Sequence, residues 1–419
     1  MIDEKFAGEI INYLVNEVNQ SLPERFNERL PWNFALAWQS LGEIRNPSQI
    51  DRVVNNLIEK TLEIYKRYIF SGIGFQKFNR EHILPAVLNI SNLTAAERPV
   101  VEFIKNIGGI SFGVWFGGSP VIGLGKFLGK LGSQYESLRE AALVITNADE
   151  LGVAAEVGLS TITYGWKDRP DTQALLRQLS TSRRLTDIRS LAIMLLGEHY
   201  NHEPSTLPLL QEVALSSDED EICAKAIETI NLNYEVDEKF LRLLHDLLDN
   251  DPGTRTRGTI ISVLGKHYKD DADTRLILQE SSLKDEASSV RVTAMTTLVK
   301  HFNDEQTLLL LKDRALRDPE ILCQVIAINA LAERFPNTEQ LLELLTGIAK
   351  NDASTSIDST ESGLSAWMVR HIALQRIAEH WPSHPGTLAL LREQAEKDPV
   401  AEVRELAQQL ADTLDRGRR

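Results

Sequence analysis

Apolar residues recur at helical spacing through the second half of the chain, in units that repeat. In one unit Val290, Ala294, Met295, Leu298 and Phe302 mark one side of a helix, because residues three or four positions apart share a helical face. This helix follows an acidic residue and ends before a polar turn, after which a second apolar stripe begins. The pattern predicts pairs of helices between residues 187 and 410.

A recurring residue, arginine in most units, gives the register of the repeat. It falls at Arg189, Cys223, Arg257, Arg291, Gln324, Arg370 and Arg404, with steps of 34, 34, 34, 33, 46 and 34 residues. About seven copies of one two-helix unit predict an all-α solenoid, in which each copy buries its apolar face against its neighbours. A degenerate half-unit near residues 155–166 is expected to cap the array.

The recurring residue types resemble one repeat family. Tetratricopeptide repeats share the period, but their series of Trp, Leu-Gly, Tyr, Ala, Phe and Pro does not run through these units. An acidic residue, then apolar-Arg, Ala and Leu recur instead, and this series resembles HEAT-like repeats. The stretches beginning Tyr164-Gly165-Trp166 and His380-Trp381 further resemble the C-terminal HEAT arrays of prokaryotic NACHT-type (STAND) NTPases. The resemblance covers residues 151–415 and implies an α-α superhelix of the armadillo-like kind.

The NTPase motif of those proteins does not occur in this sequence. A P-loop needs glycine, four further residues, then Gly-Lys-Ser/Thr, because the hydroxyl holds magnesium beside the phosphates. Gly125-Lys126 and Gly129-Lys130 are followed by Phe127 and Leu131 instead. We therefore expect no enzyme activity, no cofactor and no metal site, and we expect a scaffold or sensor portion that binds a partner.

Residues 1–150 lack the repeat and are predicted to form a separate helical domain of unknown type. Ile50, Val54, Leu57 and Leu62 carry the stripe of one long amphipathic helix there. The glycine-rich segment 106–125 has no charged residue. It suits a tightly packed helical corner, because glycine lets backbones approach, and it leaves open contact with a membrane.

Composition limits the partners. The chain has 45 Lys and Arg against 60 Asp and Glu, a net charge of −15, which disfavours nucleic acid because binding its phosphates needs a basic face. The basic tail 416–419 is short. Cys223 and Cys323 form no CxxC pair, and the N-terminus has no apolar signal segment. We therefore expect the protein to be located in the reducing environment of the cytoplasm.

Two sets of repeated positions are candidates for specific roles. In the resembled family the register arginine pairs with an acidic residue of a neighbouring turn, so a structural ladder is expected at Arg189, Arg257, Arg291, Arg370 and Arg404. Positions five and nine residues further on share the opposite face of the same helix, which lines the concave side in that family. These predicted partner-binding residues are Ser262, Thr296, Asn329 and Gln375, and beside them Lys266, Lys300, Glu333 and Glu379.

The function expected from these patterns is protein or peptide binding in the concave groove, with the resemblance implying a tie to NACHT/STAND-type signalling or defence. An insertion rich in Ser, Thr and Asp near residues 352–365 interrupts the array and suits either a binding loop or a tolerated surface loop. Two alternatives stay open: a HEAT-like phycobilin lyase or lyase-like chaperone, and a membrane-associated adaptor that uses segment 106–125. The oligomeric state is left open.

Overall fold

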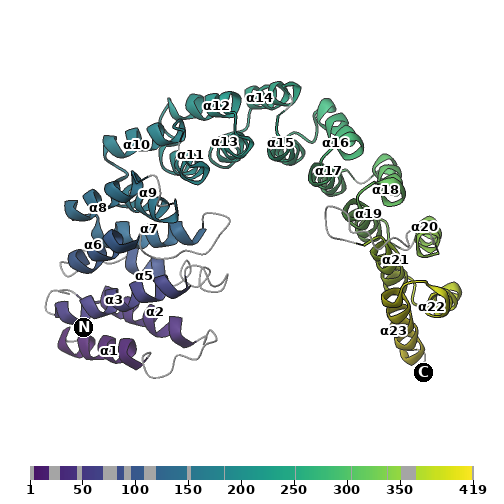
Figure 1. Ribbon diagram of the computed structural model, residues 1–419, viewed down its shortest axis with the longest axis horizontal. Coiled ribbons are helices and arrows are strands. Elements are labelled where there is room, and N and C mark those ends of the chain that lie inside the picture. The colour runs from purple at the N-terminus through teal and green to yellow at the C-terminus, as the bar shows by residue number, and fades with distance from the viewer. Residues whose placement is uncertain are drawn as a thin grey trace. The chain divides into compact units, whose positions relative to one another are not determined.

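The computed structural model describes residues 4–17, 29–44, 50–68, 83–88, 96–107, 119–148, 152–183, 185–250, 252–302, 304–336, 338–350 and 365–417. Every element of regular secondary structure within these ranges is a helix, which confirms the predicted all-α solenoid (Figure 1). Packing divides the chain into two compact units, residues 1–217 with 232–234, and residues 218–231 with 235–419. This division by packing falls inside the repeat array. The domain border near residue 150 was predicted from the position at which the sequence repeat begins.

The first unit is a stack of helices. In chain order they are α1 (Glu4–Glu17), α2 (Arg29–Gly42), α3 (Asp51–Tyr68), α5 (Leu84–Leu88), α6 (Glu97–Asn106), α7 (Ser119–Gly132), α8 (Glu136–Thr146), α9 (Gly152–Trp166), α10 (Pro170–Ser180), α11 (Thr186–Tyr200) and α12 (Thr206–Ser216). Their buried apolar residues form two clusters, one from α1 to α9 and one from α9 to α11. Helix α3 matches the predicted amphipathic helix, and its Val54, Leu57 and Leu62 are buried. The ring of Phe127 lies against Trp38 and Tyr65, with centroid distances of 5.6 and 5.2 Å.

Helices α7 and α9 pack with their backbones in close approach. A Cβ placed on Gly129 would lie 2.7 Å from the Thr161 carbonyl oxygen and 2.8 Å from the Gly165 nitrogen. A Cβ on Gly125 would lie 2.2 Å from the Cβ of Ser160. Glycine is therefore required for this helix pair, which agrees with the packed corner expected at the end of segment 106–125; residues 108–118 of that segment lie outside the described residues.

The second unit is built from helices that alternate between two layers (Figure 1). The inner layer consists of α13 (Asp220–Asn233), α15 (Thr254–His267), α17 (Ser288–His301), α19 (Ile321–Arg334), α21 (Trp367–His380) and α23 (Ala401–Gly417). The outer layer consists of α14 (Glu238–Asp249), α16 (Ala272–Lys284), α18 (Glu305–Arg317), α20 (Glu339–Ala349) and α22 (Pro385–Lys397). Inner helices from α15 onwards pack against one another in sequence, and each outer helix packs against the inner helix that follows it.

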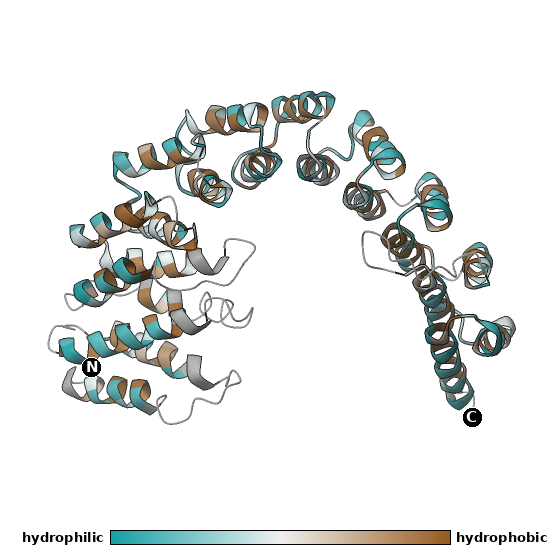
Figure 2. Cartoon of the chain, in the orientation of Figure 1, coloured by the Kyte–Doolittle hydropathy of each residue, from teal (hydrophilic) through white to brown (hydrophobic). Residues whose placement is uncertain are grey.

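The core of the second unit lies between these layers. Figure 2 shows apolar and polar residues on different sides of the same helices. Most of the buried apolar residues from Ile261 of α15 to Ala411 of α23 belong to one cluster. In the predicted stripe Val290, Ala294, Met295 and Leu298 are all buried. This unit therefore buries its apolar area between successive helical pairs, as expected for a repeat array.

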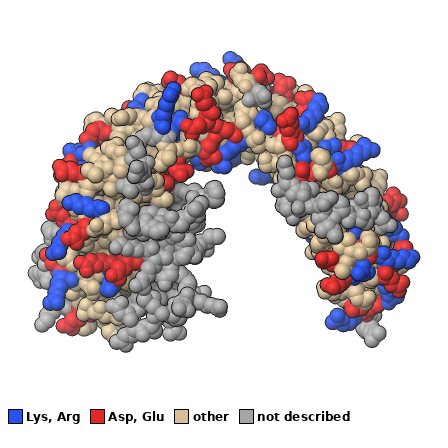
Figure 3. Space-filling model, in the orientation of Figure 1, with Lys and Arg blue, Asp and Glu red and all other residues tan. Residues whose placement is uncertain are grey.

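Several sequence predictions fall on residues that the structure does not describe. The insertion between α20 and α21 lies outside the described residues from 351 to 364, as do residues 418 and 419 of the basic tail. Within the described ranges, no helix combines the length and the apolar character needed to cross a membrane. In the view of Figure 3, acidic and basic side chains are interspersed over the surface.

Candidate partner-binding groove

The register arginines lie at the contacts between consecutive helical pairs. Each of three guanidinium groups donates two hydrogen bonds to the aspartate that precedes the next inner helix. The pairs are Arg257 with Asp285 at 2.8 and 2.9 Å, Arg291 with Asp318 at 3.0 and 2.8 Å, and Arg370 with Asp398 at 2.8 and 3.0 Å. This bidentate geometry matches the planar shapes of the two groups and fixes one unit against the next.

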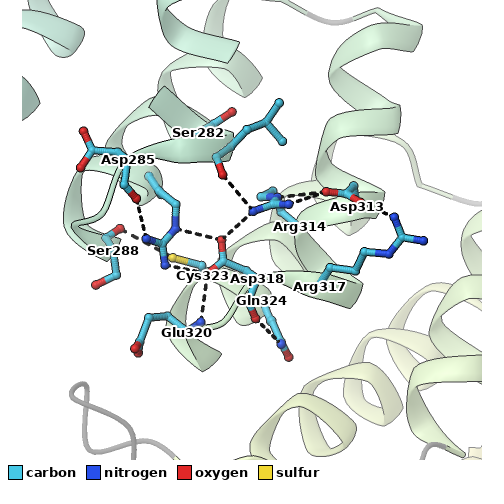
Figure 4. A network of polar contacts seen from close by, with 12 residues as sticks. Ser282, Asp285, Ser288, Asp313, Arg314, Arg317, Asp318, Glu320, Cys323 and Gln324 are labelled. Carbon is cyan, nitrogen blue, oxygen red and sulfur yellow. Dashed lines mark hydrogen bonds and ion pairs between the residues drawn. The ribbon is translucent and has the colours of Figure 1, made fainter. Parts of the chain in front are cut away.

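Asp318 takes part in further hydrogen bonds besides the pair with Arg291 (Figure 4). Its carboxylate also accepts a hydrogen bond from the Glu320 backbone nitrogen at 3.0 Å, and its carbonyl oxygen accepts one from Gln324 Nε2 at 2.7 Å. Gln324 occupies the register position of arginine in α19, so a neutral side chain here keeps the bond to its own turn. Burial raises the pKa of the Cys323 thiol to about 12, so the thiol stays uncharged at neutral pH. Cys323 therefore serves as a buried packing residue.

The other two ladder residues differ from these three. Arg404 Nη1 donates to the Asp398 carbonyl oxygen at 2.6 Å, as Arg291 Nη1 does to the Asp285 carbonyl oxygen at 2.8 Å. Arg189 lies in α11 of the first unit and is buried. The arginine set thus occupies packing contacts, and its side chains do not form the predicted partner-binding row.

A groove of about 550 Å³ lies on the inner layer between α13, α15 and α17. One of the predicted partner-binding residues, Ser262, lines it and is exposed. Buried Val263 and Val290 form apolar parts of its wall. The other lining residues are mostly small or polar: Asp220, Glu228, Asn231, Thr254, Arg255, Gly258, Thr259, Ser289 and Thr293.

The charged residues of the groove are largely engaged within the chain. Asp220 accepts hydrogen bonds from the backbone nitrogens of Arg255 and Thr256, both at 2.8 Å. Although burial raises the pKa of Asp220, these bonds and one from the Thr256 hydroxyl hold it below its usual range. Arg255 Nε forms an ion pair with Glu221 at 2.8 Å. The Asp220 carboxylate of α13 therefore satisfies two backbone N–H groups at the start of α15, where negative charge is favourable.

One polar atom of the groove has no such engagement. The Oδ1 atom of Asn231 is buried and accepts no hydrogen bond from a described residue, although Asn231 lines the groove. A buried acceptor without a donor is costly. Nearby Gly258 adds no side chain, and a Cβ there would meet no atom within 4 Å. A ligand N–H could satisfy this acceptor once the Asn231 side chain turns towards the groove, because Oδ1 is closed to solvent in the arrangement described.

The remaining predicted residues lie along the inner layer beyond the groove. Thr296 of α17 is exposed, and its hydroxyl donates to the Val292 carbonyl oxygen at 2.9 Å. Asn329 Oδ1 accepts from Arg376 Nε at 2.9 Å, which joins α19 to α21. Gln375 Nε2 donates to Glu379 Oε1 at 3.0 Å. Two of the four residues of the predicted row, Asn329 and Gln375, thus form hydrogen bonds with other side chains of the chain.

The charged column beside this row changes sign between α17 and α19. Lys266 on α15 and Lys300 on α17 are exposed. Glu333 is exposed on α19, and Glu379 on α21 forms an ion pair with Arg376 at 2.6 Å. The column thus carries exposed positive charge on α15 and α17 and negative charge on α19 and α21.

His199 and His384, which lie near helix ends, have contacts within the chain. His199 lies edge-on to Tyr164, with ring centroids 4.8 Å apart, and burial lowers its pKa. His384 Nδ1 accepts a hydrogen bond from the Gly386 nitrogen at 3.1 Å and caps α22. Within the described ranges, no group of three or more His, Cys, Asp or Glu residues is placed to hold a metal ion.

Of the residues that line the groove, only Ser262 was predicted from the sequence to bind a partner. Gly258 and Thr259 precede Ser262 by about one helical turn. The spacing of these small residues on α15 could therefore have indicated that they share a face with Ser262. Asn231 stands outside both predicted columns, and only the packing of α13 reveals its position. No protein-family model matches this chain, and the search of curated proteins finds none similar to it.

Proposed function

We propose that the second unit binds an extended peptide segment of a partner protein on its inner layer, as a non-catalytic scaffold or sensor. The observation that carries this proposal is the groove between α13, α15 and α17, where the unpartnered Asn231 Oδ1 lies among hydroxyl groups. A peptide main chain supplies N–H donors for such an acceptor and carbonyl oxygens for hydroxyl donors.

The spacing of the inner helices suits an extended chain. Packed helices lie about 8–10 Å apart, and an extended peptide rises about 3.3 Å per residue. Roughly every third residue of the peptide would then face the next inner helix. Val263 and Val290 would contact an apolar side chain of the peptide, while Ser262 would lie beside its main chain.

The charged residues Lys266, Lys300 and Glu333 predict which part of the partner peptide is acidic and which part is basic. Lys266 and Lys300 favour acidic residues in the part of the peptide that crosses α15 and α17, and Glu333 favours a basic residue further along. Charged groups at the rim of a binding surface mainly set specificity and the rate of association. The expected partner segment is therefore acidic at one end and neutral or basic at the other.

Selection from a random peptide library displayed on phage tests this function. Wild type should enrich a family of peptides with an acidic part, and Gly258→Gln, which fills open space in the groove, should lose them. Gly347→Gln is the matched control, because Gly347 of α20 is a helical glycine of the outer layer that also has open space around it. No enrichment, or enriched peptides that bind Gly258→Gln as well as wild type, would reject the groove as the binding site.

A further inference from the structure

Four leucines on two neighbouring outer helices are exposed to solvent. They are Leu276 and Leu283 of α16 and Leu309 and Leu316 of α18, with between 39% and 59% of each residue exposed. The two leucines of each helix are seven residues apart, which places them on one face about two turns from each other. Single exposed leucines are ordinary, but an apolar cluster on one face marks a contact surface.

Contacts at both ends show that α16 and α18 lie side by side and run in the same direction. At the beginning of α16, Arg275 Nη2 pairs with Asp304, the N-cap of α18, at 2.6 Å. Near the ends of the two helices, Arg314 Nη1 donates to the Leu283 carbonyl oxygen at 3.4 Å. The four leucines therefore belong to one patch, which we call the leucine face.

Among the outer helices of the second unit, this pair of exposed leucines occurs in α16 and α18; in α12 of the first unit, the position equivalent to Leu283 also carries an exposed leucine, Leu215. The corresponding exposed positions are Arg242 and Asp249 in α14, Glu343 and Lys350 in α20, and Ala389 and Glu396 in α22. The repeat fold itself thus does not require leucine at these positions. Something other than packing within the chain accounts for the apolar residues of α16 and α18.

Charges on both sides of the leucine face are complementary to each other. The first turns of the helices carry Asp273 and Glu305, and the last turns carry Lys284 and Arg317. Lys284 and Arg317 also pair with Glu280 and Asp313 of their own helices, at 2.7 and 3.0 Å, and remain mostly exposed. In a second copy related by a two-fold axis that lies in the contact plane and perpendicular to α16 and α18, these helices would run antiparallel to those of the first. Its acidic edge would then lie against the basic edge of the first copy, and the leucines of the two copies would meet between these edges.

We infer that the leucine face is a self-association surface, through which two copies of this chain form a symmetric dimer. Two-fold interfaces use the same patch on both subunits, so a self-complementary surface is what such a dimer requires. The contact lies on the outer layer and leaves the inner layer free, so it does not depend on the proposed peptide binding.

Sedimentation equilibrium of the full chain tests this inference. Wild type should show a concentration-dependent equilibrium between monomer and dimer. The double variant Leu276→Ser, Leu309→Ser should raise the dissociation constant at least about 100-fold. Each copy loses two half-exposed leucines, so the dimer interface loses four. Leu185→Ser, at an exposed leucine of the first unit, is the matched control and should leave the dimer unchanged. A wild-type monomer at every concentration would overturn the inference.

Charge exchange tests the two-fold arrangement itself. Lys284→Glu with Arg317→Glu makes both edges acidic, and Asp273→Lys with Glu305→Lys makes both edges basic. Each variant alone should be monomeric, and an equal mixture should form a heterodimer, with circular dichroism confirming that both are folded. A mixture that stays monomeric, or single variants that dimerise like wild type, would contradict the proposed pairing of edges.

Discussion

Arg291 and Asp318 form a buried ion pair between consecutive inner helices, with side-chain exposures of 5% and 0%. The guanidinium donates two hydrogen bonds to the carboxylate and another to the carbonyl oxygen of Asp285. One residue therefore contacts the turn before its own helix and the turn before the next inner helix. This explains how a repeat that contacts only its neighbours keeps a constant stacking arrangement.

Substitution of Arg291 by alanine is expected to destabilise the second unit. It leaves Asp318 buried without its main partner, and breaking such a pair costs about 3–5 kcal/mol. Arg404→Ala should cost less, because Arg404 donates to a carbonyl oxygen. Urea unfolding of the two variants checks this order. Equal and small losses for both would show that the buried pair adds nothing to stability.

The helix pair α7 and α9 should not tolerate a methyl group at Gly129. The added Cβ would lie 2.7 and 2.8 Å from backbone atoms of α9, so Gly129→Ala must push the helices apart and lower the melting temperature. Gly347→Ala is the matched control, because nothing lies within 4 Å of its Cβ and alanine favours a helix interior by about 1 kcal/mol. A stabilised Gly129→Ala would disprove the close approach.

Glu156 makes the stability of the first unit depend on pH. Only 7% of this residue is exposed, and burial, with a contribution from Asp187, raises its pKa from 4.5 to about 7. The folded state therefore keeps a proton that the unfolded chain releases. The free energy of unfolding should fall as pH rises from 4.5 to 7 and stay low above pH 7, with a loss on the order of 3 kcal/mol.

Glu156→Gln removes this titration and provides the test. The variant should melt at a higher temperature than wild type at pH 8, and the difference should shrink towards pH 5. Differential scanning calorimetry at both pH values measures it. A difference that is the same at pH 5 and pH 8 would mean that Glu156 does not titrate between them.

The fold was predictable because its determinants are local and repeated. The apolar stripe of Val290, Ala294 and Leu298 and the arginine register recur about every 34 residues, and a periodic pattern determines which faces are buried. The family resemblance implied that the register arginines pair with acidic residues of neighbouring turns. In the structure Arg257, Arg291 and Arg370 form ion pairs with Asp285, Asp318 and Asp398, respectively.

The candidate site was predictable only in part. Ser262 follows from helical geometry, but the groove also needs the position of α13 relative to α15, which no local pattern specifies. The bond between Arg376 and Asn329 joins residues 47 positions apart across the insertion. Asn231 and Arg376 take part because of tertiary packing, and their residue types alone do not indicate it.

Calorimetric binding of one selected acidic peptide tests the central claim, that the inner layer of the second unit holds a partner segment. Lys266→Glu with Lys300→Glu should weaken binding about 10- to 100-fold and change stability by no more than about 0.5 kcal/mol. The control Lys312→Glu, on the outer helix α18, should bind like wild type. Equal weakening by both variants, or weakening by neither, would contradict binding on the inner layer.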